Sequence, residues 1–535
     1  MIFPLERTIH MTAQLPRRRR LALAGAALAA ALVLSSCAAG AAPGDAAAGG
    51  DPVSGGTLTF GRVASADNLD LNQQITANNA FAIDKIFEPL VSFDEQGAIV
   101  PWLAEYTAND AGTEYVFTLR EGLTFSDGTP VTPADVVFSL NRHLEVEGPL
   151  PLTAPIGSIA ETGERDVTIT LKTPYTPFLS ELAGFSNGIF PKDFGGVSEE
   201  EFFQKPIGTG PFAVEKFDPN GDLSFVKNEH YWQEGKPYLA GLEYRVIADD
   251  AQLRQQLAAG QIDAIDTVPA ANAAEVDSAA DTVLSNTSGW STEQVFFNTQ
   301  RAELGDQHVR RAIAHALDRE GITAATTFDT AEVANALLPP TITDSANDTV
   351  TPLAFDVEAA KAELAKSAYP DGFSTTLLIA SGNAQRAQIA QIVQESLAKI
   401  GITVKIEQLD IAVFRERFFA YDFDMMLNSG QSDAPDPNGF ITFQADPEGF
   451  SKSYWTHYTN DQVTQLMHEG RTTAEGPERT KIYAEIQQIL ADDVPYIPLF
   501  FPANLKATTS EVQGFTVLPN GSVLFQDAWL TGGGK

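Results

Sequence analysis

A serine flanked by glycines is the first candidate for catalysis in this 535-residue chain. Gly184-Phe185-Ser186-Asn187-Gly188 fits the pattern G-x-S-x-G, in which a sharp turn between a buried strand and a helix holds a nucleophilic Ser Oγ. Here the preceding residues 177–182 predict a short helix instead of a strand, and Pro191 follows closely. The flanking sequence therefore favours a chance match in a loop over a hydrolase nucleophile.

Motifs for metal or cofactor chemistry are equally weak. The sequence has no HExxH, no P-loop and no paired cysteines, and Cys37 is its one cysteine. His308 and His315 lie two turns apart on a predicted helix, too far for one metal ion. We therefore expect no enzyme activity, no metal site and no cofactor. Because carboxylates are numerous, a secreted serine or acid hydrolase is kept as the alternative from another class.

The strands and helices predicted from the sequence, which would position any site, are typical of an α/β protein. Tyr115 to Leu119 is a β-branched and aromatic run that predicts a strand, and Asp127 with Gly128 predicts a tight turn. Thr132 is then the expected N-cap of a helix with Pro133 at its first position and Asp135 in its first turn. We accordingly interpret Asp127 and Asp135 as turn and cap residues.

The second half of the chain repeats the alternation of strand and helix. A long helix over 383–399 separates predicted strands at 375–379 and 402–408, and short β-α-β connections imply a parallel sheet. A further strand at 423–427 leads into a polar loop, and one at 496–501 comes near the end.

Two stretches carry a more specific resemblance. L-R-x-G-x-x-F-S-D-G-T-P-x-T-x-x-D-V-x-F-S at 119–139 and V-R-x-A-I-x-x-A-L-D-R at 309–319 resemble the family 5 extracytoplasmic solute-binding proteins, the receptors of bacterial ABC importers. The resemblance implies an α/β, two-lobed fold of the periplasmic-binding-protein type II class, with an extra subdomain inserted in the first lobe. The expected parts are an export signal (1–36), a flexible tether (37–55), the base of the first lobe (56–88, 206–293 and 502–535), the inserted subdomain (89–205) and the second lobe (294–501).

The resemblance also supplies a ligand-binding candidate. In peptide-binding members, a loop after a strand of the second lobe carries an Asp that pairs with the ligand's α-ammonium, followed by an Asp-Pro. The loop N-S-G-Q-S-D-A-P-D-P-N at 428–438 matches, with Asp433 at the ammonium-binding position and Asp436 as the structural follower. The alternative interpretation makes Asp433 an Asx-turn residue in a loop that contains prolines.

A peptide ligand also needs partners for its carboxylate and its side chains. Arg386 and Arg415, or Arg417 in place of the latter, are candidates for the carboxylate, and each is otherwise a solvated surface residue. Trp290 and Trp455, with Tyr454 beside it, are candidate aromatic walls or else core residues.

The N-terminal segment predicts export and lipid anchoring. Arg17 to Arg20 precede an apolar stretch at 21–34, too short for a membrane span and typical of a signal peptide. It ends in L-S-S-C, which resembles a lipobox, so Cys37 is the expected site of acylation and membrane attachment. Export by the general or by the twin-arginine pathway is left open.

The negative net charge limits the kinds of partner that the protein can bind. With 35 Lys and Arg against 70 Asp and Glu, the net charge is -35, which disfavours nucleic acid and anionic lipid surfaces. We therefore expect a monomeric receptor that is lipid-anchored outside the cytoplasmic membrane, captures di- or oligopeptides and delivers them to an ABC permease with its ATPase subunits. Oligosaccharides, opines and metal chelates are alternative solutes, and an adhesion or scaffold protein is a third class.

Overall fold

The computed structural model describes residues 51–73, 76–146, 148, 152–219, 221–449 and 456–532. Residues 49–535 form one compact unit. The expected export signal with Cys37, and the segment with Tyr454 and Trp455, lie outside the described residues. Within the described part of the chain, no helix has the length and apolar character needed to cross a membrane.

A twelve-stranded sheet runs through the body. Its strand order is β16-β15-β17-β13-β18-β11-β1-β10-β9-β8, and β12 and β14 also pair with β18. The strands are β1 (Thr57–Arg62), β8 (Phe212–Phe217), β9 (Leu223–Lys227), β10 (Gly241–Val246), β11 (Ala264–Ile265), β12 (Thr282–Ser288), β13 (Ser291–Phe297), β14 (Ala331–Val333), β15 (Ser374–Ala380), β16 (Thr403–Leu409), β17 (Met425–Gln431) and β18 (Tyr496–Thr509).

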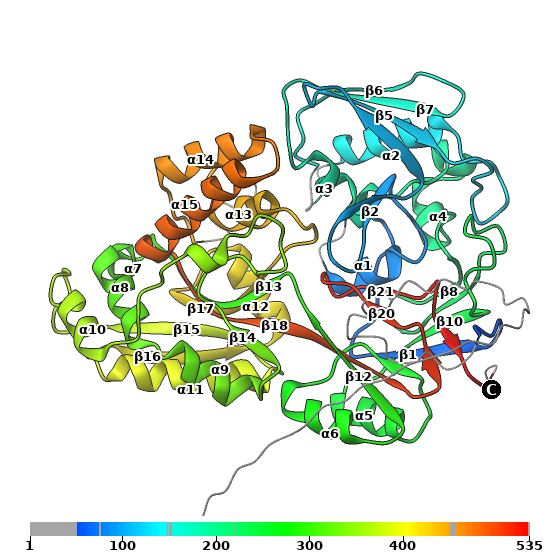
Figure 1. Ribbon diagram of the computed structural model, residues 1–535. Coiled ribbons are helices and arrows are strands. Elements are labelled where there is room, and N and C mark those ends of the chain that lie inside the picture. The colour runs from blue at the N-terminus through cyan, green and yellow to red at the C-terminus, as the bar shows by residue number, and fades with distance from the viewer. Residues whose placement is uncertain are drawn as a thin grey trace, which may run out of the picture. The chain divides into compact units, whose positions relative to one another are not determined.

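The long strand β18 joins the two halves of this sheet, as Figure 1 shows. Its first residues pair with β13 and its last residues pair with β12 and β11. The part with β1 and β8–β12 is called the first lobe below, and the part with β13–β17 and the helices between residues 302 and 493 the second lobe. The chain passes between them at the β12–β13 connection and again along β18.

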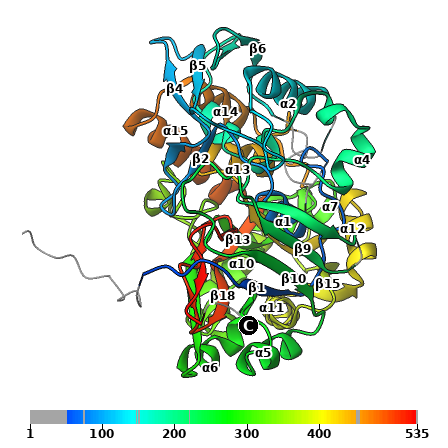
Figure 2. The same cartoon turned by 90° about the vertical axis from the view of Figure 1, so that its right-hand side faces the viewer.

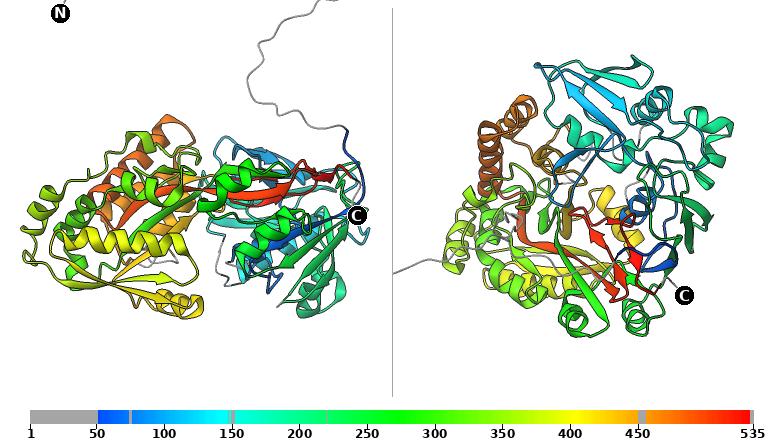
Figure 3. Two further views of the ribbon diagram at one scale, coloured as in Figure 1. Left: turned by 90° about the horizontal axis from the view of Figure 1, so that it is seen from below. Right: turned by 45° about the vertical axis from the view of Figure 1, so that its right-hand side comes forward.

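The parallel order predicted for the second lobe is confirmed. β15 pairs in parallel with β16 and with β17, and α11 (Ala384–Ala398) connects β15 to β16. Asn383 caps this helix by accepting a hydrogen bond from the backbone N of Arg386 at 2.9 Å. Ile389, Val393 and Leu397 on α11 are buried in the core formed with these strands, and Figure 3 shows the yellow helix lying along them.

A separate four-stranded sheet forms the inserted subdomain, visible at the top of Figure 2. Its order is β4 (Ala104–Ala108), β5 (Glu114–Leu119), β7 (Asp166–Leu171) and β6 (Ile156–Glu161), with α2 (Pro133–Glu145) packed on it. The predicted cap of α2 is confirmed, since the backbone N of Thr132 donates to Asp135 Oδ2 at 2.7 Å. Asp127 holds the preceding turn by accepting from the backbone N of Thr129.

Two predicted helices differ from the structure. The apolar spacing of the sequence predicts a helix over 78–90, but α1 ends at Ile83. Beyond it the backbone N atoms of Lys85 and Ile86 donate to Ala82 O and Ile83 O, three residues back, so the helix gives way to tighter turns. The helix expected over 308–319 ends at Ala316, because Leu317 is extended and Asp318 caps a new helix. A favourable cap thus overrides a continuous apolar spacing.

The remaining elements complete both lobes. The helices are α1 (Ala77–Ile83), α3 (Phe178–Leu182), α4 (Glu199–Gln204), α5 (Asp250–Ala258), α6 (Ala273–Ser278), α7 (Ala302–Gly305), α8 (Gln307–Ala316), α9 (Arg319–Thr327), α10 (Val357–Leu364), α12 (Ile411–Phe419), α13 (Pro437–Ala445), α14 (Asp461–Thr472) and α15 (Pro477–Asp493). Short two-stranded pairs join β2 (Val91–Phe93) to β3 (Ile99–Pro101), β19 (Val512–Gln513) to β22 (Trp529–Leu530), and β20 (Thr516–Val517) to β21 (Val523–Leu524).

A buried carboxylate lies where the inserted subdomain leaves the first lobe. Glu88 is 4% exposed and accepts hydrogen bonds from Trp102 Nε1 at 2.9 Å, Tyr231 OH at 2.8 Å and Trp232 Nε1 at 3.0 Å. Burial raises its pKa from 4.5 to about 7, against the opposing effect of these hydrogen bonds. One acidic side chain therefore ties together three aromatic residues from both sides of the junction.

This carboxylate predicts a pH dependence of stability. Between pH 4.5 and 7, folded Glu88 holds a proton that the unfolded chain releases, so the free energy of unfolding falls as pH rises through this window. The loss is about 3 kcal/mol at most. Urea unfolding at pH 5 and pH 7.5 is expected to show a smaller loss for Glu88→Gln than for wild type. An equal loss in both proteins would assign the dependence to other groups.

Candidate ligand-binding site

Three segments of the second lobe leave its sheet at the same edge. Because β15, β16 and β17 are parallel, their carboxyl ends face the same way. α11 begins four residues after β15, α12 two residues after β16, and the loop 432–436 follows β17. In open α/β sheets, ligands bind outside this edge. The predicted residues Arg386, Arg415 and Asp433 belong to these three segments.

Asp433 is the acidic residue at this edge whose pKa is clearly raised. Its side chain keeps solvent-accessible surface, yet protein surrounds the carboxylate closely enough that the loss of hydration raises its pKa to about 6. Among the described residues it has neither a hydrogen-bond partner nor an ion-pair partner. At neutral pH it is a mostly ionised carboxylate at an exposed position, and a cation that binds beside it would neutralise its charge.

The backbone around Asp433 is fixed on both sides. Ahead of it, the backbone N of Ser432 donates to Trp290 O at 2.9 Å, and Ser432 Oγ donates to Ala434 O at 2.7 Å. Behind it, Asp436 caps α13 by accepting from the backbone N of Asn438 at 2.7 Å. The loop therefore holds the Asp433 carboxylate in place without using its oxygens.

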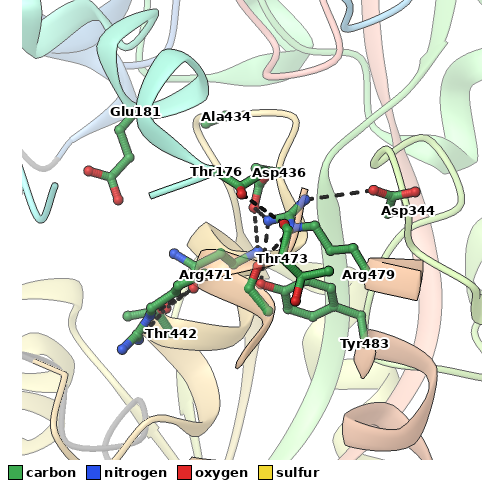
Figure 4. Close-up of polar contacts among 12 residues, drawn as sticks. Thr176, Glu181, Asp344, Ala434, Asp436, Thr442, Arg471, Thr473, Arg479 and Tyr483 are labelled. Carbon is green, nitrogen blue, oxygen red and sulfur yellow. Dashed lines mark hydrogen bonds and ion pairs between the residues drawn. The ribbon is translucent and has the colours of Figure 1, made fainter. Parts of the chain in front are cut away.

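Asp436, which fixes the loop on the far side of Asp433, is itself held by Arg479 of α15. The sequence did not single out this arginine. Figure 4 shows Arg479 beside Asp436, and Arg479 Nη2 donates to Asp436 Oδ1 at 2.7 Å. Arg479 Nε donates to Gly470 O at 3.0 Å. Its guanidinium lies over the ring of Tyr483, 4.9 Å from the centroid, and only 1% of its side chain is exposed. The Asp436 carboxylate is thus engaged in a cap and a buried ion pair.

Arg386 is also engaged in the structure. Its Nε and Nη2 donate to the two carboxylate oxygens of Glu293 at 2.8 and 2.9 Å, and Nη2 donates to Ser429 Oγ at 2.8 Å. Glu293 and Ser429 are cross-strand partners on β13 and β17. By contrast, Arg415 is exposed on α12. A solute carboxylate at Arg386 would share this guanidinium with Glu293.

Trp290 lies in the core next to the candidate site. It is 1% exposed and its ring packs against Phe93, with centroids 4.9 Å apart. Gly97 also approaches the ring so closely that a Cβ there would lie 3.0 Å from Trp290 Cζ2. The alternative of a core role therefore fits this conformation, and the backbone oxygen of Trp290 supports the loop through Ser432.

The environment of Ser186 does not resemble a nucleophile elbow. It lies in a single 3-10 turn, Phe185–Asn187, that follows helix α3 and not a strand. The residue is buried, and its backbone oxygen accepts from Asn72 Nδ2 at 2.8 Å. Within the described ranges, no group of three His, Cys, Asp or Glu side chains is arranged to hold a metal ion.

The fold and the site together define a two-lobed α/β solute-binding protein with a subdomain inserted in its first lobe, as the sequence predicted. The chain belongs to the bacterial extracellular solute-binding proteins, family 5, whose middle region matches residues 98–452.

Relatives of known name are similar over nearly the whole chain. The probable D,D-dipeptide-binding periplasmic protein DdpA of Escherichia coli K12 is 28% identical over 480 residues, covering 86% of this chain and 92% of that protein. The structure of DppA from Helicobacter pylori with the peptide STSA matches with a TM-score of 0.80 at 26% identity, covering 90% and 99%. The structure of the oligopeptide-binding protein AppA from Bacillus subtilis with a nonapeptide matches with a TM-score of 0.78 at 27% identity. The match covers 90% of this chain and 100% of that chain.

Proposed function

We propose that this chain is the receptor of an ABC importer that captures di- or oligopeptides outside the cytoplasmic membrane and delivers them to a permease with its ATPase subunits. The observation that carries the peptide assignment is Asp433, an unpartnered carboxylate of raised pKa at the ligand-binding edge. The peptide-binding names of the relatives support it.

The proposed recognition is electrostatic. An ammonium group of the solute pairs with Asp433 as the lobes close, and closure removes water, which strengthens the ion pair. Contacts made only in the closed form shift the equilibrium between open and closed lobes toward the closed form. The solute is then presented to the permease in the closed receptor, without chemical change.

Other residues are assigned supporting roles in the same proposal. Arg386, whose guanidinium the solute would share with Glu293, and Arg415 are assigned to the solute carboxylate. Trp455 is assigned to the solute side chains, whereas Trp290, the other aromatic candidate, supports the loop from the core. Asp436 contributes through the cap and ion pair that hold the loop.

We propose the lobe boundaries given by the sequence: 56–88, 206–293 and 502–535 for the first lobe, 89–205 for the insertion and 294–501 for the second lobe. The receptor is a monomer held at the outer face of the membrane by a lipid on Cys37.

Native mass spectrometry of the purified body from residue 40, followed by calorimetry, tests the proposal. Co-purified peptides, and binding of free peptides that disappears on N-acetylation, are the expected results. A bound sugar, opine or metal chelate, or indifference to acetylation, would overturn the peptide assignment. Turnover of a peptide or ester substrate that Ser186→Ala abolishes would instead identify a hydrolase.

The raised pKa of Asp433 predicts that binding weakens in acid. The carboxylate is ionised above pH 6 and neutral below it, so affinity for an amine-bearing peptide is expected to fall by about tenfold from pH 7.5 to pH 5. Calorimetry at both values measures the change, and Asp433→Asn is expected to remove it. A constant affinity in wild type would show that this carboxylate does not face the solute.

A further inference from the structure

A turn between β7 and α3 hydrogen-bonds the inserted subdomain to the second lobe, beside apolar contacts between the same two parts. The backbone N of Thr176 donates to Arg471 O at 2.8 Å, and Thr176 Oγ1 donates to Thr473 O at 2.7 Å. Beside them, Asn438 Nδ2 donates to Tyr175 OH at 3.1 Å. Figure 4 shows Thr176 at the end of α14, close to Arg471 and Thr473. Three hydrogen bonds therefore bridge the two parts of the protein.

Each bridging group has its orientation set from its own side. Tyr175 OH donates to Glu181 Oε1 at 2.5 Å, which leaves an oxygen lone pair to accept from Asn438. Arg471 Nε donates to Asn438 Oδ1 at 3.0 Å, so the amide of Asn438 must present its NH2 toward the tyrosine. Arg471 is held in turn by Asp446 at 2.5 Å. The Tyr175 and Asn438 side chains are thus each oriented by a residue on their own side of the bridge.

The bridge is buried in part and adjoins the ligand-binding loop. Tyr175 is 6% exposed and Asn438 is 1% exposed, so their hydrogen bond is shielded from water, whereas Thr176, Arg471 and Thr473 are half-buried. Asn438 lies in the first turn of α13, the helix that Asp436 caps at the end of the Asp433 loop. The same helix end therefore carries the ligand-binding loop on one side and the bridge on the other.

We propose that Tyr175, Thr176 and Asn438, with the backbone oxygens of Arg471 and Thr473, form a latch that holds the inserted subdomain against the second lobe and stabilises the closed receptor. The inference rests on the proposed function, since it assumes lobes that open and close. Because α13 joins the latch to the Asp433 loop, solute binding and latch formation favour each other. The latch contributes to affinity without touching the solute.

Distances between two spin labels, one on each side of the latch, measure how much of the protein is open and how much is closed. The full chain with Cys37→Ser has no native thiol, and Glu164→Cys in the inserted subdomain with Lys399→Cys in the second lobe places labels at two exposed sites. Double electron–electron resonance between the two labels then gives the populations of the open and closed forms. One arm uses protein stripped of solute by refolding from urea, and the other uses protein with the solute it carries on purification.

Tyr175→Phe with Thr176→Val removes both bridging hydroxyl groups and keeps the apolar contacts, and Tyr175→Phe also removes the hydrogen bond to Glu181 inside the inserted subdomain. The ratio of open to closed protein is expected to rise by about fivefold or more. Thr162→Val is the matched control, because Thr162 Oγ1 contacts Thr168 Oγ1 within the same subdomain at 2.8 Å. It is expected to leave the ratio unchanged.

Equal ratios for wild type and the double variant in both arms would overturn the latch, as would an equal effect of Thr162→Val. The single variants Tyr175→Phe and Thr176→Val are measured alongside, each expected to give a smaller shift in the same direction. They replace the double variant if it does not fold. The stripped arm needs no ligand, so the latch is tested even if peptides prove not to be the solute.

Discussion

Asp433→Asn is expected to weaken the binding of a free-amine peptide by about 2–5 kcal/mol, the cost of removing one partner of a desolvated charge pair. The substitution keeps the size and shape of the side chain and removes its charge. Calorimetry at pH 7.5 with one peptide found in the purified protein measures the change. The same peptide with an acetylated amino group is expected to bind wild type and variant equally weakly.

The same variant is expected to keep or raise the stability of the solute-free protein. Burial raises the pKa of Asp433, so its ionised form at neutral pH is less favourable in the folded protein than in the unfolded chain. Replacing it with a neutral amide removes that penalty, and urea unfolding measures the difference. A side chain whose replacement weakens binding without lowering stability contributes to function and not to the fold.

Asp410→Asn is the matched control for both measurements. Asp410 lies at the same sheet edge and caps α12 by accepting from the backbone N of Ala412 at 2.9 Å. Asn is an equally good cap, so neither binding nor stability should change by more than a few tenths of a kcal/mol. Either of two results would show that Asp433 does not bind the solute ammonium. One is wild-type peptide affinity in Asp433→Asn, and the other is an equal loss of affinity in Asp410→Asn.

Local features of this chain could be predicted from sequence because their causes are local. Thr132, Pro133 and Asp135 stand next to one another and are sufficient to start α2. The helix α11 was equally predictable, since Asn383 caps it and its apolar residues recur at helical spacing. Parallel pairing of β15 with β16 then followed from the short connections.

The partners of the site residues could not be predicted, because they come from distant segments. Asp436 pairs with Arg479, which lies 43 positions later on another helix, and no spacing in the sequence links them. Arg386 meets Glu293 across 93 positions, and Trp290 packs on Phe93 of the inserted subdomain. A sequence pattern gave the type of each residue, whereas the three-dimensional fold decides whether its charge or ring is already engaged.

Arg479→Ala is expected to lower the free energy of unfolding by about 3–5 kcal/mol, because it leaves the Asp436 carboxylate buried without its partner. Asp436 is 6% exposed, and the same substitution removes the contact with the Tyr483 ring and the hydrogen bond to Gly470 O. Urea unfolding followed by circular dichroism measures the loss. Peptide affinity should fall too, since the Asp433 loop loses its second anchor.

Lys481→Ala provides the control on the same helix, since Lys481 is exposed and its ion pair with Glu478 spans 3.6 Å. Such a surface pair is worth at most about 1 kcal/mol. The double variant Arg479→Met with Asp436→Asn keeps a capping side chain and removes both charges, so it should be more stable than Arg479→Ala. If Arg479→Ala cost no more than Lys481→Ala, the buried pair would not be what holds the ligand-binding loop. If the double variant were the less stable of the two, the loss would come from the missing contacts of Arg479, not from an uncompensated charge on Asp436.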